Sequence, residues 1–211
     1  MAEKIVLVYL ARHGTTTLNA SNCFRGNLNP SLDEQGFRDA HRLAFYFRSI
    51  ELSHIFSSDK LRAMQTSKII ADAKKMEVIP NEQLRALNVG NFSGKERTAA
   101  NLEALKHYID NPTETIPGGE SLADFQARVR PLFQDAMEIA ADCGVPALIV
   151  GHSSLVHELG EAVNGGHETT LVKPGGCAAL YCSNGELYAE PVFKPDLARM
   201  KQVVARYEVV S

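Results

Sequence analysis

Two uninterrupted runs of apolar residues mark the centre of the expected fold. Residues 5–10 read Ile-Val-Leu-Val-Tyr-Leu, and residues 147–150 read Ala-Leu-Ile-Val between a proline and a glycine. Each run is too short to span a membrane, and unbroken apolar strands are typical of a parallel sheet that is covered on both faces. The pattern therefore predicts two buried strands, far apart in the chain.

Apolar residues at spacings of three and four predict the helices. Asp33 is the expected N-cap of the first, and Phe37, Ala40, Ala44 and Phe47 form its expected buried stripe. Further helices are expected after a capping sequence at 57–59, over 96–108, from Ser121 to about Ala140, from Leu155, and from Pro195.

Shorter segments complete the expected sheet. Strands are predicted at 53–57, at 77–80 and as a hairpin of 178–182 with 187–189 around the Asn184-Gly185 turn. Pro80 cannot donate a ladder hydrogen bond, so its strand is expected at an edge. The alternation of strands and helices predicts a three-layer α/β/α sandwich with a mostly parallel central sheet, as a single domain over residues 1–211.

Length and charge narrow the possible partners. A chain of 211 residues that is 45% apolar can form one substantial core. Its 22 basic and 25 acidic residues give a net charge of −3, which provides no global field to attract nucleic acid or an anionic membrane. Any anion site must therefore be local.

The four cysteines are scattered along the chain. Cys177 and Cys182 are separated by five positions, which places them on opposite faces of a strand, so they are interpreted as core thiols rather than as metal ligands. The first residues lead into the strand and do not resemble a signal peptide. We therefore expect a cytoplasmic protein with reduced cysteines.

Candidate chemistry begins where the first apolar run ends, at Arg12, His13 and Gly14. Strand ends of α/β proteins open into the crevice that binds ligands. A guanidinium group binds two phosphate oxygens at once, and a neutral imidazole can attack phosphorus. These residues therefore predict a phosphate site, although the same three residues could also form an ordinary polar strand end.

Two more residues support the phosphate site. Arg62 falls in the first turn of a predicted helix, where a cation is unfavourable unless it faces an anion. His152 follows the second buried strand, as His13 follows the first. Two histidines and two arginines can surround one tetrahedral anion.

The chain resembles the histidine phosphatase superfamily, also called the phosphoglycerate mutase-like family. The resemblance is carried by Leu10-Ala11-Arg12-His13-Gly14 with Asn19, by residues 57–66, by Gly118-Gly119-Glu120-Ser121, and by the strand that ends at His152. It implies a phosphoglycerate mutase-like fold with His13 as the phosphorylated nucleophile. Arg12, Arg62 and a protonated His152 would hold the phosphate oxygens, with no metal or other cofactor.

The resemblance also implies the substrate contacts. They are Thr16, Asn19, Arg25, Gly26 and Ser153, with Arg25 and Gly26 on a loop that closes over the phosphate. A loop arginine can also be merely solvated, so Arg25 is open to either interpretation.

The clearest departure from the family pattern is Ala86, which occupies the position of a glutamate that serves as general acid. Glu120 is the expected replacement because the Gly118-Gly119 turn should bring it near the pocket mouth, and Glu96 is second. Glu120 could instead complement the dipole at a helix N-terminus.

These observations favour a metal-independent phosphomonoesterase. It would act through a phosphohistidine on a small phosphorylated metabolite or on a phosphoprotein. The segment from Gly94 to Pro117 is short and has only Lys95, Arg97 and Lys106 as basic residues, whereas a mutase needs a longer, basic lid. A mutase-type phosphotransferase and a catalytically weak phosphate- or phosphopeptide-binding module are the alternatives. The oligomeric state is left open.

Overall fold

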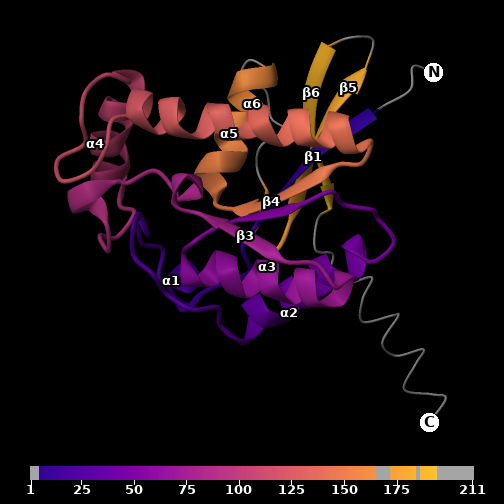
Figure 1. Cartoon of the computed structure of the whole chain (residues 1–211). Coiled ribbons are helices and arrows are strands. Elements are labelled where there is room, and N and C mark those ends of the chain that lie inside the picture. Colours follow the sequence, from indigo (N-terminus) through magenta and orange to yellow (C-terminus); the bar gives the residue numbers. More distant parts are fainter. Residues whose placement is uncertain (1–4, 165–171, 184–185, 194–211) are drawn as a thin grey trace.

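The computed structural model describes residues 5–164, 172–183 and 186–193, and its centre is a six-stranded sheet between two helical layers (Figure 1). The strands are β1 (Ile5–Arg12), β2 (Ile55–Ser58), β3 (Val78–Asn81), β4 (Ala147–Gly151), β5 (Cys177–Ser183) and β6 (Glu186–Phe193). The helices are α1 (Thr17–Ala20), α2 (Glu34–Phe47), α3 (Leu61–Lys74), α4 (Ala99–Asp110), α5 (Leu122–Cys143) and α6 (Ser153–Asn164), with short 3-10 turns η1 (Glu82–Leu84) and η2 (Gly90–Phe92).

The sheet order is β3-β2-β4-β1-β5-β6. The four strands from β3 to β1 run parallel, whereas β5 is antiparallel to β1 and β6 is antiparallel to β5. The predicted three-layer sandwich with a mostly parallel sheet is confirmed, and β3 lies at an edge as expected. Within the described residues, no helix has the length and apolarity needed to cross a membrane.

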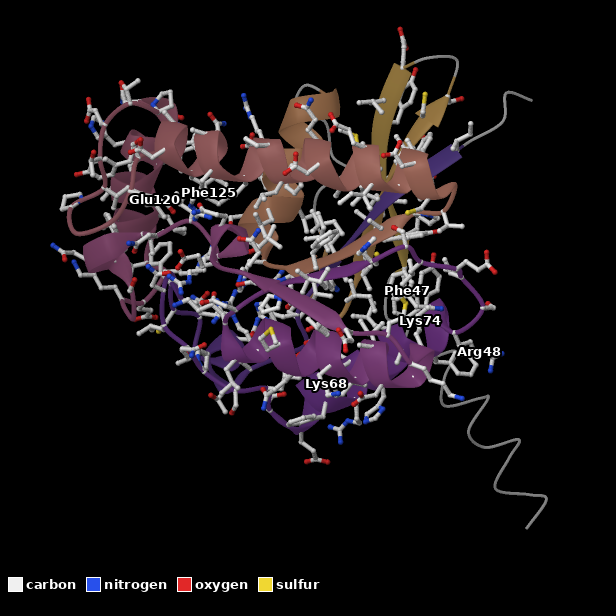
Figure 2. The ribbon with its side chains drawn as sticks, in the orientation of Figure 1. Phe47, Arg48, Lys68, Lys74, Glu120 and Phe125 are labelled. Atoms are coloured by element: carbon white, nitrogen blue, oxygen red, sulfur yellow. The ribbon has the colours of Figure 1, made fainter. Side chains whose placement is uncertain are left out.

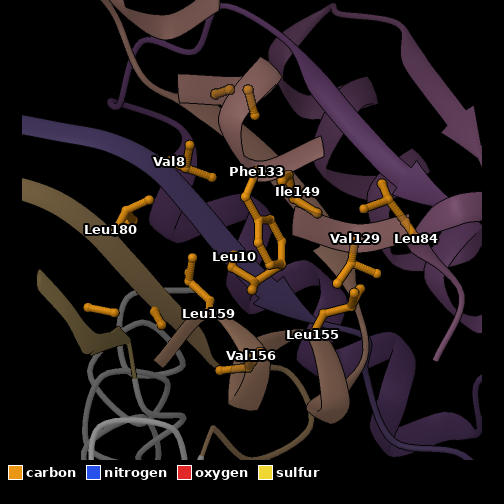
Figure 3. Close-up of a cluster of buried hydrophobic side chains, with 14 of the residues drawn as sticks. Val8, Leu10, Leu84, Val129, Phe133, Ile149, Leu155, Val156, Leu159 and Leu180 are labelled. Atoms are coloured by element: carbon orange, nitrogen blue, oxygen red, sulfur yellow. The ribbon is translucent and has the colours of Figure 1, made fainter. Parts of the chain in front are cut away.

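Alternate side chains of the central strands pack into two separate hydrophobic cores, one on each face of the sheet. Leu10 of β1 and Ile149 of β4 lie in the cluster that α5 and α6 cover (Figure 3). Ala11 and Leu148, one position away, lie in the cluster beneath α2 and α3. Because both faces of β1 and β4 are buried, these strands need an unbroken apolar sequence.

The ends of several helices differ from the sequence expectation. Asp33 accepts a hydrogen bond from the Gly36 N–H at 2.7 Å and caps α2 as predicted. The expected cap of α3 is not formed by 57–59, because the carboxylate of Asp59 binds the Arg85 guanidinium instead. Helix α4 begins at Ala99 and α6 at Ser153, and β6 extends to Phe193. The expected Asn184-Gly185 turn and the helix from Pro195 lie outside the described residues.

The buried face of α2 is rotated away from Phe37, which was predicted to be buried and is 40% exposed. The start of α2 lies against the loop after β1, where a Cβ on Gly36 would come within 2.0 Å of the Thr15 carbonyl oxygen. This close backbone approach centres the buried face on Gly36, Ala40 and Leu43. At 100° per residue, Phe37 then falls at the edge of the face.

Two phenylalanines of α2 provide a matched test of this packing. Phe47 is fully buried and Phe45 is 64% exposed. We expect Phe47→Ala to lower the free energy of unfolding by about 3–5 kcal/mol, because it leaves a cavity. Phe45→Ala should cost at most about 1 kcal/mol, the value of its contact with the Arg48 guanidinium. Urea unfolding of both variants measures the difference, and equal losses would contradict the assigned face.

Candidate active site

The parallel pairing of β1 and β4 brings the two predicted histidines together. Arg12 is in register with Gly151, and the His13 N–H donates to the Gly151 carbonyl at 3.0 Å. The His13 and His152 rings lie 5.3 Å apart between centroids, and each residue is 2% exposed. Residues far apart in sequence thus share one buried site.

His13 is oriented by the backbone of the next residue, Gly14. Its Nδ1 lies 2.7 Å from the Gly14 carbonyl oxygen, an acceptor, so Nδ1 carries the proton and donates. Nε2 is therefore the unprotonated nitrogen, and it accepts a hydrogen bond from Arg62 Nε at 3.2 Å. A nucleophilic imidazole needs this tautomer.

Arg62 is only 1% exposed, and hydrogen bonds hold it in place from several sides. Its Nη1 donates to the Leu28 carbonyl at 2.8 Å. Thr66 Oγ1 donates to the Arg62 carbonyl at 2.8 Å and accepts from the Gly14 N–H at 3.1 Å, so α3 is tied to the loop after β1. No carboxylate of the described residues forms an ion pair with Arg62. The guanidinium is therefore a fixed, uncompensated cation.

Two buried nitrogens of the site have no hydrogen-bond partner in the described part of the chain. They are Arg12 Nε and His152 Nδ1. Arg12 Nη1 donates to the Val172 carbonyl, and His152 Nε2 lies 2.9 Å from Ser58 Oγ, so both side chains are anchored at one end. Buried polar groups without partners are costly, and a bound oxyanion would satisfy them.

The electrostatics of the site keep both histidines neutral. Burial, followed by the charge of Arg62, lowers the pKa of His13 and of His152 well below the ordinary value of 6.5. Burial beside cations disfavours a positive charge on His152, whereas the sequence-based expectation of a protonated His152 concerns the phosphate-bound site and stays a prediction. Burial also lowers the pKa of Arg12 and of Arg62 to about 10, so both remain cations at neutral pH.

The site opens into a pocket of about 140 Å³ that contains most of the predicted residues. Its lining residues are His13, Cys23, Phe24, Arg25, Gly26, Arg62, Ala86, Leu87, Val89, Arg97, His152, Ser153 and Ser154. No carboxylate is among them. Arg25, Gly26 and Ser153 therefore lie where substrate contacts were predicted, and the charge of Arg12, Arg62 and Arg25 acts on both histidines.

Arg97 was not predicted as a pocket residue. Its N–H donates to the Asn22 carbonyl at 2.9 Å, and Cys23 forms a β-bridge with Glu96. The Arg97 guanidinium lies 5.2 Å from the centre of the Phe24 ring. The only sequence signal was a basic residue shortly after Gly94, which did not reveal the pairing of the two loops.

Thr16 and Asn19 do not line the pocket, contrary to the substrate contacts that were expected. Asn19 Oδ1 accepts from the Thr16 N–H at 3.0 Å and from Thr16 Oγ1 at 2.8 Å. Their side chains are used to begin α1, since a polar residue three positions into a helix can cap its start. The structure supports a local structural role for both residues.

The structure does not place Glu120 as the replacement acid. Its Oε1 accepts from the Asn88 N–H at 2.8 Å and from Arg128 Nη2 at 2.7 Å, and its Oε2 accepts from Arg128 Nε at 2.9 Å. Figure 2 shows Glu120 near Phe125, at the start of α5. Both carboxylate oxygens are therefore already bound by protein donors, and Glu120 is not among the residues that line the pocket of His13. Glu96, the second candidate, is exposed and does not line the pocket either.

Comparison with known proteins identifies the family. The family model of the histidine phosphatase superfamily (branch 1) matches residues 8–176. The chain belongs to this superfamily. It is 38% identical over 149 residues to the probable phosphoglycerate mutase GpmB of Yersinia enterocolitica, a match that covers 69% of this chain and 68% of that protein.

Two solved structures show the histidine phosphatase fold with different names. The phosphoglycerate mutase of Bacillus anthracis has a TM-score of 0.76 at 23% identity and covers 92% of this chain and 94% of its own. A mycobacterial glucosyl-3-phosphoglycerate phosphatase has a TM-score of 0.71 at 22% identity and covers 92% and 99%. At these identities the likeness concerns the fold alone, so it does not separate the mutase reaction from the phosphatase reaction.

The neutral histidines predict a specific loss of stability in acid. Folding lowers the pKa of both histidines, so below about pH 6.5 the unfolded chain binds more protons than the folded chain. The free energy of unfolding therefore decreases as the pH is lowered. Each histidine should contribute at most about 1.4 kcal/mol per pH unit. We expect His13→Asn/His152→Asn to lose less free energy of unfolding between pH 7 and pH 5 than the wild type, in urea titrations.

Exposed His41 on α2 provides the control for this experiment. His41→Asn is measured in parallel to reveal any general effect of replacing a histidine with asparagine. An unchanged slope in the double variant would show that the two pocket histidines are not held neutral.

Proposed function

We propose that this chain is a metal-independent phosphomonoesterase that acts through a phosphohistidine on a small phosphorylated metabolite or on a phosphoprotein. The observation that carries the proposal is the arrangement of His13, whose Nδ1 is tied to Gly14 while Nε2 faces Arg62 in a pocket lined by arginines. Membership of the histidine phosphatase superfamily supports the same chemistry.

The proposed reaction has two steps. In the first, His13 Nε2 forms a bond to phosphorus while the bond from phosphorus to the ester oxygen breaks, and the leaving oxygen takes up a proton from solvent water. In the second, water attacks phosphorus and gives up a proton to solvent, the N–P bond breaks, and phosphate leaves with His13 neutral again. Arg12 and Arg62 would stabilise the equatorial oxygens, where transition-state charge is spread.

Two alternatives remain distinct from this proposal. A mutase would return the phosphoryl group to a second hydroxyl rather than to water, and one relative carries that name. A phosphate-binding module would retain affinity without turnover, and Ala86 in the place of the usual acid favours that alternative. Release of inorganic phosphate separates both from a phosphatase.

His13 is expected to carry the phosphoryl group during turnover. Rapid quenching with labelled phosphoester, in the presence of EDTA, should trap an acid-labile label on the wild type and none on His13→Ala. Activity should fall by a factor of at least about 10⁴, because the nucleophile is lost. Label that persists in His13→Ala, or activity that disappears with EDTA and returns with a divalent ion, would contradict the proposal.

The missing acid should make the enzyme sensitive to its leaving group. With Ala86, aryl phosphates should react much faster than alkyl phosphates, because a poor leaving oxygen needs a proton. Ala86→Glu should raise turnover of alkyl esters by about 10²-fold and change aryl esters little, and Ala86→Gln, with similar size and no acid, should not.

Glu120→Gln is the second arm of the leaving-group experiment. Since Glu120 is engaged by Arg128 and Asn88, its replacement should affect alkyl and aryl esters by similar factors. A selective loss on alkyl esters would restore Glu120 as the acid.

A further inference from the structure

A second hollow lies beside the pocket that His13, Arg62 and His152 line, which we call the phosphate pocket. The two share Ala86. This recess has a volume of about 200 Å³ and is lined by Asn27, Glu82, Gln83, Arg85, Ala86, Asn88, Glu120 and Arg128. We propose that the recess is the binding subsite for the leaving group of the substrate, and that it takes an uncharged group rich in hydroxyls. The inference rests on the proposed phosphatase function, for which it names a substrate class.

Two chain segments run from one hollow into the other. Arg25 and Gly26 line the phosphate pocket and the next residue, Asn27, lines the recess. Leu87 lines the phosphate pocket while Asn88 lines the recess, and Ala86 borders both. The hollows are therefore neighbours along two separate walls, with only a methyl group where the family pattern has a glutamate. A group attached to the phosphate can extend past Ala86.

The wall of the recess is rigidly built by Arg128. Its guanidinium donates to Glu120 through Nε and Nη2, to the carbonyls of Gln83 and Arg85 through Nη1, and to the Ala86 carbonyl through Nη2. These bonds use all five N–H groups of an arginine. Arg128 is therefore occupied as a scaffold and does not serve as an anion receptor.

The other charges of the recess are also compensated. Arg85 binds both carboxylate oxygens of Asp59 and lies 3.4 Å from a carboxylate oxygen of Glu82. Glu120 is paired with Arg128. This differs from the phosphate pocket, which Arg25, Arg62 and Arg97 line without a carboxylate. The recess therefore favours a neutral polar group, because a charged one would have to compete with existing ion pairs.

Three amide side chains remain to bind that group. Within the described residues, the side chains of Asn27 and Gln83 and the Nδ2 of Asn88 form no hydrogen bond with the protein. Asn88 Oδ1 accepts from the Gly90 N–H at 3.1 Å, which fixes the direction of its amide. An amide both donates and accepts, and hydroxyl groups do the same, so polyol chains and sugars are complementary to this surface.

The test compares primary alkyl phosphates that share one type of leaving oxygen. We expect kcat/KM to rise by about tenfold or more from ethyl phosphate to glycerol 1-phosphate and mannitol 1-phosphate, since each added hydroxyl can bond an amide. Phosphoglycolate, in which a carboxylate replaces the methyl group of ethyl phosphate, should not show this increase.

Variants of the recess test whether the higher kcat/KM of polyol phosphates arises there. Asn27→Ala/Gln83→Ala and Ala86→Leu should each bring the polyol-to-ethyl ratio of kcat/KM close to one, because they remove the amides or close the passage. Gln134→Ala, an exposed amide of α5, should keep the wild-type ratio. A wild-type ratio near one, a ratio that the variants leave unchanged, or a preference for phosphoglycolate would overturn the proposal.

Failure of the proposed phosphatase function can be distinguished from failure of the subsite proposal. It would appear as no phosphate release and no His13 label with any ester. In that case the same ratios are obtained from dissociation constants of these esters by calorimetry, so the subsite is still decided.

Discussion

The parallel pairing of β1 with β4 determines where the rest of the molecule must lie. It brings the ends of two strands to one edge of the sheet, so His13 and His152 become neighbours although 138 residues separate them. The same pairing requires both strands to be apolar on both faces, and the two helical layers follow from that requirement. Arg62 completes the site because Thr66 ties α3 to the loop that carries Gly14.

The sequence was sufficient for the fold class and the centre of the site, because both depend on strong local signals. An apolar run that ends at a histidine specifies a buried strand and the place of its last side chain. The prediction that Phe37 is buried was wrong because the close approach of Gly36 to Thr15 rotates α2. That contact joins two separate segments, so the sequence pattern of α2 alone does not reveal it. Arg97 was missed for a similar reason, since its place depends on the pairing of two irregular loops.

Glu120 illustrates a different limit of sequence analysis. The Gly118-Gly119 turn before it suggested a carboxylate near the pocket mouth that could act in place of the missing acid. In the structure that carboxylate binds Arg128 and Asn88 instead, and it fixes the wall of the recess beside the phosphate pocket. Residue type and approximate location do not reveal which partners a carboxylate binds, because these partners come from segments that only the fold brings together.

The lining of the phosphate pocket contains no carboxylate that could offset the positive charge of its arginines. Folding without an anion gathers Arg12, Arg25 and Arg62 close enough for their charges to act on one another. A bound oxyanion removes this repulsion, and any ligand of the native state adds RT ln(1 + [L]/Kd) to its stability. The fraction of the chain that is folded should therefore increase with the concentration of any oxyanion that this pocket binds.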